Sequence, residues 1–135
     1  MIKKCLFPVA GYGTRFLPAT KSMPKEMLPI VNKPLVQYGV EEAVRSGVRH
    51  VVFVTNPGNL MTASHFAPVP ALEDALAERG KTELLAAVRA LTAMADVTTV
   101  HQAEPLGLGH AVLCSRPAVG DAPFAVILPD DVIDA

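Results

Sequence analysis

The sequence predicts an α/β fold, with a mainly parallel sheet flanked by helices. Short apolar runs alternate with segments of helical periodicity along the whole chain. The apolar runs lack regular polar alternation, which is typical of strands buried on both faces of a parallel sheet. The chain has 135 residues, of which 50% are hydrophobic and 19% are charged, so its length and composition fit part or all of one globular domain.

The first half of the chain contains two of the predicted strands. An apolar run predicts the first strand over residues 4–9, and a loop rich in glycine and proline follows over residues 10–33. A helix is predicted over residues 34–46, with a proline at its start, Gly47 at its end, and an apolar stripe formed by Val36, Val40, Ala43 and Val44. The second strand is predicted over residues 51–55, and it leads into the turn Asn56-Pro57-Gly58-Asn59.

The second half contains more helix. Helical periodicity predicts a short helix over residues 60–66 and longer helices over residues 71–79 and 83–93. Thr82 is the candidate N-cap of the last of these, whose predicted apolar face is formed by Leu84, Leu85, Val88 and Leu91. The remaining predicted elements are a third strand over 97–101, a helix over 107–115 and a fourth strand over 124–128.

The ligands of open α/β sheets bind outside the carboxyl ends of the strands. Unusual segments follow three of the predicted strands: the glycine-rich loop after the first, residues 101–107 after the third, and Asp130 with Asp131 after the fourth. The chain therefore predicts a binding site where these segments meet.

The loop that begins at Gly11 and Gly13 suggests an anion site. It is not a Walker A loop, which requires GxxxxGK[ST], and Phe16 stands where a dinucleotide fingerprint has its third glycine. Glycines nevertheless allow main-chain N–H groups to approach a phosphate closely. One carboxylate, Glu26, stands in this loop against four cations: Arg15, Lys21, Lys25 and Lys33. The composition alone fits a surface loop with solvated lysines equally well.

Charge and composition exclude several classes of partner. The net charge of −1 gives no global basic field for nucleic acid, and no apolar run approaches the roughly 18 residues of a membrane span. Cys5 and Cys114 lie far apart without a CxxC motif, which indicates reduced thiols and a cytoplasmic location, with Cys5 buried in a strand. The mean hydropathy of +0.33 suggests exposed apolar surface, and we expect a homo-oligomer.

Several segments resemble the signature of the sugar-nucleotide nucleotidyltransferases. The match is carried by GYGTRFLPATK at residues 11–21, PKEMLP at 24–29, KPL at 33–35, GLGHA at 107–111, and the segment from Gly120 to Asp130. The sequence is most similar to the branch of this family that uses UTP and glucose 1-phosphate. The resemblance implies a Rossmann-like fold in which residues 1–135 form the nucleotide-binding N-terminal part of one domain, with the C-terminal half absent.

The resemblance also implies an activity and a set of roles. The activity is uridylyl transfer from UTP to glucose 1-phosphate, giving UDP-glucose and pyrophosphate, with Mg²⁺ as cofactor. Arg15 would clamp the β- and γ-phosphates, Lys25 would lie near the α-phosphate, and Asp130 would bind the metal. The implied nucleotide-binding residues are Ala10, Gly11, Gly13, Thr14, Glu26, Gln102 and Gly107.

Some roles and functions stay open at this point. Glu26 could contact the base or form a surface pair with Lys25. The amide of Gln102 could donate to O4 and accept from N3–H of uracil, but thymine offers the same edge and a flipped amide suits cytosine. His110 is interpreted as structural, and Asp131 competes with Asp130. The alternative functions are thymidylyl transfer to the same sugar phosphate, nucleotide binding without catalysis, and an apolar fragment that dimerises.

Overall fold

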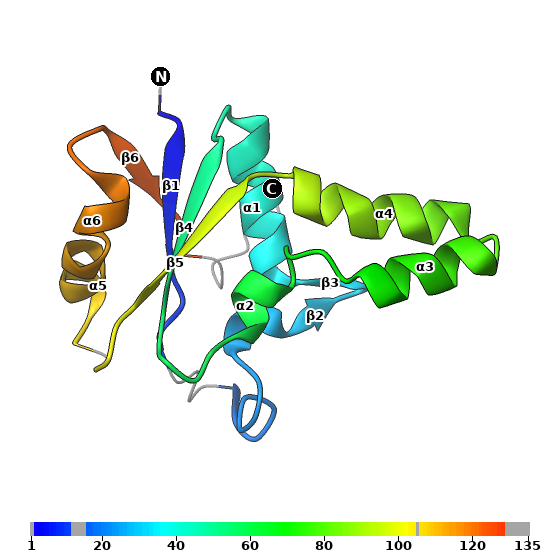
Figure 1. Ribbon diagram of the computed structural model, residues 1–135. Coiled ribbons are helices and arrows are strands. Elements are labelled where there is room, and N and C mark those ends of the chain that lie inside the picture. Colours follow the sequence, from blue (N-terminus) through cyan, green and yellow to red (C-terminus); the bar gives the residue numbers. More distant parts are fainter. Residues whose placement is uncertain (1, 12–15, 105, 129–135) are drawn as a thin grey trace.

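The computed structural model describes residues 2–11, 16–104 and 106–128. Within them, a four-stranded sheet has the order β5-β4-β1-β6, and all of its pairings are parallel. The strands are β1 (Lys4–Pro8), β4 (His50–Thr55), β5 (Asp96–His101) and β6 (Phe124–Val126). Helices flank the sheet (Figure 1), so the predicted α/β fold with a mainly parallel sheet is confirmed.

Both faces of the central strands are buried, because successive side chains of a strand point in opposite directions. On one face, Phe7 and Phe53 pack with ring centroids 5.7 Å apart, and α1 (Leu35–Arg45) and Phe66, which follows α2 (Met61–Ser64), cover them. On the other face, Leu6, Val52 and Val54 pack against Ala111 and Val119. These last two residues belong to α5 (Leu108–Cys114) and α6 (Arg116–Val119).

The predicted stripe of α1 is confirmed. Val36, Val40 and Ala43 are buried in the core, and Val44 packs against it partly buried. Pro34 precedes the helix as its N-cap residue, so the helix begins one residue later than predicted. Gly47 lies beyond the end with φ of 99°, a conformation that favours glycine.

Three local predictions are wrong. No side chain of β5 is fully buried, because within the described part of the chain β5 is an edge strand with β4 as its single neighbour. Lys81, not Thr82, is the N-cap residue of α4 (Thr82–Ala93). Leu84 is 57% exposed, because α4 packs mainly against α3 (Pro70–Glu78), and this helical hairpin projects away from the sheet (Figure 1).

The predicted loop over residues 10–33 contains short elements that periodicity does not reveal. They are the 3₁₀ turn η2 (Lys25–Met27) and the antiparallel pair β2 (Pro29–Ile30) and β3 (Lys33–Pro34). Elements of two or three residues are too short to show a hydrophobic period. Periodicity misses the four-residue helix α6 for the same reason. No helix in the described part of the chain is long and apolar enough to span a membrane.

Candidate functional site

Segments that are distant in sequence meet at the carboxyl edge of the sheet. The N–H of Val9 donates to the carbonyl of Val54 at 2.7 Å, and the N–H of Gln102 donates to the carbonyl of Thr55 at 2.7 Å. These bonds continue the strand pairing beyond β1 and β5, so the loops after both strands start at fixed positions on either side of β4. The other predicted site residues on this edge lie outside the described residues: Gly13, Thr14, Arg15, Asp130 and Asp131.

One half of the site, which we call the glycine-loop side, is formed by Ala10, Gly11 and Lys25. A Cβ atom placed on Gly11 would lie 3.9 Å from Nζ of Lys25, so the ammonium group lies over this glycine. Gly11 is exposed and does not have a positive φ. Neither its backbone conformation nor its packing therefore requires glycine, whereas close approach of a ligand to its main chain would.

A cavity of about 270 Å³ opens beside Gly11. Asn56 supports it, since its Nδ2 donates to the carbonyl of Ala10 at 3.4 Å and its Oδ1 accepts from the N–H of Gly58 at 3.1 Å. The predicted site lacks several residues that line this cavity: Lys21, Ser22, Asn56 and Asn59. The turn after the second strand is the available signal for the two asparagines, because it lies at the same edge as the glycine-rich loop.

Glu26 is fully buried, and so are both oxygens of its carboxylate. The alternative that placed Glu26 on the surface is therefore wrong. Burial of a carboxylate is costly unless other groups compensate for the lost hydration, and Glu26 is not without a partner in the chain. Its predicted contact with a base remains a prediction.

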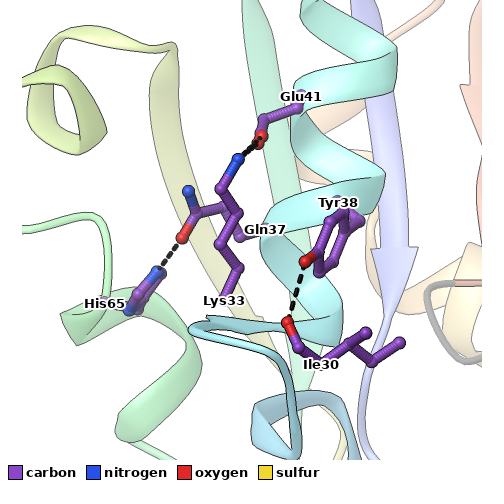
Figure 2. Close-up of polar contacts among 6 residues, drawn as sticks. All are labelled: Ile30, Lys33, Gln37, Tyr38, Glu41 and His65. Carbon is purple, nitrogen blue, oxygen red and sulfur yellow. Dashed lines mark hydrogen bonds and ion pairs between the residues drawn. The ribbon is translucent and has the colours of Figure 1, made fainter. Parts of the chain in front are cut away.

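Lys33 contacts two residues of α1 (Figure 2). Its Nζ forms an ion pair with Glu41 of α1 at 2.9 Å and lies 5.6 Å from the ring centroid of Tyr38. Tyr38 in turn donates its hydroxyl to the carbonyl of Ile30 at 2.8 Å. Lys33 and Tyr38 thus attach the β2–β3 hairpin to α1, and one of the four loop cations is neutralised within the chain.

His65, the residue after α2, forms a second contact to α1 in Figure 2. Its Nε2 lies 2.7 Å from Oε1 of Gln37. Because an amide oxygen only accepts, the histidine donates its proton here. Burial lowers the pKa of His65, which favours the neutral ring. This histidine therefore has a structural role in holding α2 against α1.

The other half of the site, which we call the glutamine side, is formed by Gln102, Gly107 and His110. Gln102 is only 4% exposed. Its Nε2 donates to the carbonyl of Gly107 at 3.4 Å and to Nδ1 of His110 at 2.8 Å. Both N–H groups of the amide therefore have partners within the chain, and the predicted donation to O4 of a base would compete with them.

Gly107 has φ of 97° and ψ of 176°, a conformation that is essentially restricted to glycine. It directs the chain from the loop after β5 into α5, and its carbonyl accepts the N–H of Ala111 at 3.1 Å. The conformation of Gly107 thus places the first turn of α5, with His110, next to Gln102.

The described residues contain no group of three or more His, Cys, Asp and Glu side chains that could hold a metal ion. The donor set implied for Mg²⁺ relies on Asp130, which lies outside them. The predicted metal ligand therefore remains a prediction.

The chain matches one protein family over almost its whole length. The pattern of the nucleotidyl transferase family matches residues 9–135. The UTP–glucose-1-phosphate uridylyltransferase of Bacillus subtilis is 52% identical over 134 residues, covering 99% of this chain and 46% of that protein. An enzyme of the same name from Pseudomonas aeruginosa is 52% identical over 132 residues, covering 98% and 47%. This chain thus spans about half the length of these relatives.

Solved structures show the same likeness. A UDP-glucose pyrophosphorylase from Acinetobacter baumannii has a TM-score of 0.89 and 46% identity, covering 96% of this chain and 46% of that one. The UTP-bound enzyme from the same organism has a TM-score of 0.88 at the same identity and coverage. A UDP-glucose pyrophosphorylase complexed with UDP-glucose has a TM-score of 0.79.

Proposed function

Since this chain belongs to the nucleotidyl transferase family, we propose that it forms the nucleotide-binding part of a UTP–glucose-1-phosphate uridylyltransferase. The observation that carries this proposal is the meeting of two family segments, at Gly11 and at Gln102–Gly107, on one edge of the sheet. The names of the relatives supply the substrates, UTP and glucose 1-phosphate.

The proposed reaction needs positioning and positive charge more than a general base. A phosphate oxygen of glucose 1-phosphate, which is already anionic, attacks the α-phosphorus of UTP. The bond from the α-phosphorus to the bridging oxygen breaks, and pyrophosphate leaves with the electron pair. Cations that neutralise the leaving group lower this barrier. Arg15 is assigned this role at the β- and γ-phosphates, and Lys25, which lies over Gly11, is assigned to the α-phosphate. Main-chain groups at Ala10, Gly11, Gly13 and Thr14 are assigned to contact the nucleotide.

The glutamine side is assigned to the base. The amide oxygen of Gln102 accepts a hydrogen bond from N3–H of uracil, while Gly107 allows the main chain to approach the ring. Mg²⁺ is the proposed cofactor, with Asp130 as a ligand, since this ion is usually held by one or two carboxylates and phosphate oxygens. The cytoplasm remains the proposed compartment, because Cys5 and Cys114 are free thiols.

A pyrophosphate-release assay on the 135-residue chain tests this proposal together with nucleotide titration. We expect weak UTP binding and no competent turnover, because orientation of the sugar phosphate can supply about 7–11 kcal/mol of barrier lowering and the family resemblance assigns that pocket to residues beyond this part. ATP binding as tight as UTP binding would contradict the base assignment. Full turnover would contradict the assignment of the sugar-phosphate pocket to other residues. A monomer, measured by light scattering, would contradict the proposed homo-oligomer.

A further inference from the structure

His110 and the orientation of the Gln102 amide form a single hydrogen-bonded unit. The C=O and NH₂ ends of a side-chain amide are nearly equal in size, so the orientation of the amide is inferred from its hydrogen-bond partners. Here Nε2 of Gln102 lies 3.4 Å from the carbonyl oxygen of Gly107 and 2.8 Å from Nδ1 of His110. A flipped amide would bring two oxygens together at Gly107, which is repulsive.

The contact also determines the tautomer of the histidine. Because the amide nitrogen only donates, Nδ1 of His110 accepts, and the ring proton of the neutral imidazole then resides on Nε2. The sulfur of Cys114 lies 3.7 Å from Nδ1 and 3.8 Å from Nε2 of the same ring. Gln102 and Cys114 thus both contact the ring, which is held in α5 by these two residues.

Together these contacts leave one polar atom of the amide for a ligand. Among the described residues no group donates a hydrogen bond to Oε1 of Gln102, whereas both N–H directions are occupied. An acceptor at this place suits uracil, whose N3 carries a proton, and opposes cytosine, whose N3 is itself an acceptor. A buried polar group that meets a mismatched partner is strongly disfavoured, so the orientation of this amide determines which pyrimidine fits.

We propose that His110 is a specificity-determining positioning residue, which locks Gln102 with its oxygen toward the base and thereby selects uracil over cytosine. This assignment rests on the proposed function, because it requires a nucleotide base at Gln102. His110 does not touch the reacting atoms in this role. It acts through Gln102, so its loss should change the choice of base more than the binding of phosphate.

The first test needs no ligand. Long-range ¹H–¹⁵N spectra of the full 135-residue chain should show His110 protonated on Nε2 and not on Nδ1. A proton on Nδ1 would overturn the assignment, since that nitrogen could then not accept from Gln102. This measurement is independent of whether the chain binds nucleotides.

The second test uses two variants with opposite properties. His110→Leu fills the volume but removes the acceptor, whereas His110→Asn places a side-chain oxygen near the position of Nδ1. NMR titrations with UTP and with CTP measure even millimolar dissociation constants. We expect the preference for UTP over CTP to fall about tenfold in the leucine variant and to recover in the asparagine variant. The control is Leu113→Ala, on the same helix at a side chain that is 63% exposed, and it should keep the wild-type ratio.

The outcomes separate the two proposals. Equal UTP-to-CTP ratios in the leucine variant and the wild-type chain would overturn the role of His110 while leaving the proposed function intact. A ratio that is lost in both variants alike would show that restoring an acceptor with asparagine does not restore the preference, and it would overturn the claim that His110 acts by accepting from the amide. If the wild-type chain binds neither nucleotide, the proposed function fails, and the tautomer measured without ligand then decides the hydrogen-bond assignment.

Discussion

On the glutamine side of the site, Gln102 is held by Gly107 and His110 through directional hydrogen bonds. On the glycine-loop side, the ammonium group of Lys25 lies over Gly11, where a Cβ atom would still find room. The first arrangement is rigid and selects by donor and acceptor geometry. The second combines open main chain with a point charge, which suits a ligand of high charge and little directionality. We therefore propose that one sheet edge carries two kinds of recognition.

The strongest response is expected on the glutamine side, from Gly107→Ala. The conformation at Gly107, with φ of 97° and ψ of 176°, strains any residue with a Cβ by about 1–3 kcal/mol. The free energy of unfolding from urea titration should fall by that amount. The control is Gly109→Ala in α5, where φ is not positive and an added Cβ would meet no described atom within 4 Å outside the helix backbone and the adjoining residues. This variant should be neutral or slightly stabilising. Equal stability of both variants would show that the backbone here adapts.

Lys25→Ala should impair the glycine-loop side alone. Loss of a hydrogen bond to a charged group costs about 2 kcal/mol, roughly 30-fold in affinity for UTP, while the weaker affinity for uridine should not change. Calorimetry or NMR titration with both ligands measures the contrast. Lys33→Ala is the matched control, because its ammonium is paired with Glu41 of α1. An equal loss of affinity for uridine in Lys25→Ala would contradict the claim that Lys25 contributes to binding the phosphates alone.

Gly11→Ala separates stability from binding on the glycine-loop side. Since the new Cβ would lie 3.9 Å from Nζ of Lys25, an ordinary van der Waals distance, the free energy of unfolding should stay within about 0.5 kcal/mol of wild type. The methyl group nevertheless covers main chain that a phosphate would approach, so we expect UTP affinity to fall about tenfold. If Gly11→Ala binds UTP with wild-type affinity, the proposal that the phosphates lie against this glycine is contradicted.

The weakest response distinguishes the two cysteines. Cys5 lies in β1, and burial raises its pKa from 9.0 to about 11, whereas Cys114 lies partly exposed beside His110. The raised value means that the folded state keeps its thiol proton to higher pH than the unfolded state. Its stabilising contribution is therefore complete below pH 9 and is lost as the pH rises toward 11.

Between about pH 8 and pH 9.5, this linkage should lower the free energy of unfolding by about 1 kcal/mol. Urea titrations of the wild-type chain and of Cys5→Ala at both pH values isolate the contribution of the thiol. At neutral pH, a thiol reagent should modify Cys114 well before Cys5. Identical pH slopes in the two proteins would show that Cys5 does not titrate in this way.

The sequence predicts the centre of this fold well because burial on both faces leaves continuous apolar runs, as in β4. It predicts the edge less well. The periodicity of α4 identifies an apolar face but not what covers it, so the exposure of Leu84 could not be foreseen. Likewise, the paired strands β2 and β3 within residues 10–33 are too short to produce a detectable hydrophobic periodicity.

The candidate site divides in the same way. Gly107 is found from a motif, whereas Gly11 and Gln102 are found from their places after predicted strands. Asn56 and Asn59 line the cavity through a neighbouring strand, a relation that exists only in three dimensions. The bond from Gln102 to His110 spans Gly107, whose unusual φ directs the chain into α5. The sequence therefore draws attention to His110 as part of a matched motif, but the spacing of residues does not predict that its partner is Gln102.

The strand order sets the dimensions of the site. β1 and β5 each neighbour β4, whose carbonyls at Val54 and Thr55 bind the first residues of the two loops. Neighbouring strands lie about 4.8 Å apart, so the starts of the two loops are separated by about 10 Å. The main chain of β4 sets this distance between the two loop starts, and side-chain substitutions in the loops do not change it. A ligand that bridges both sides must match that span, so chemical variation among ligands is expected at its ends and not in its length.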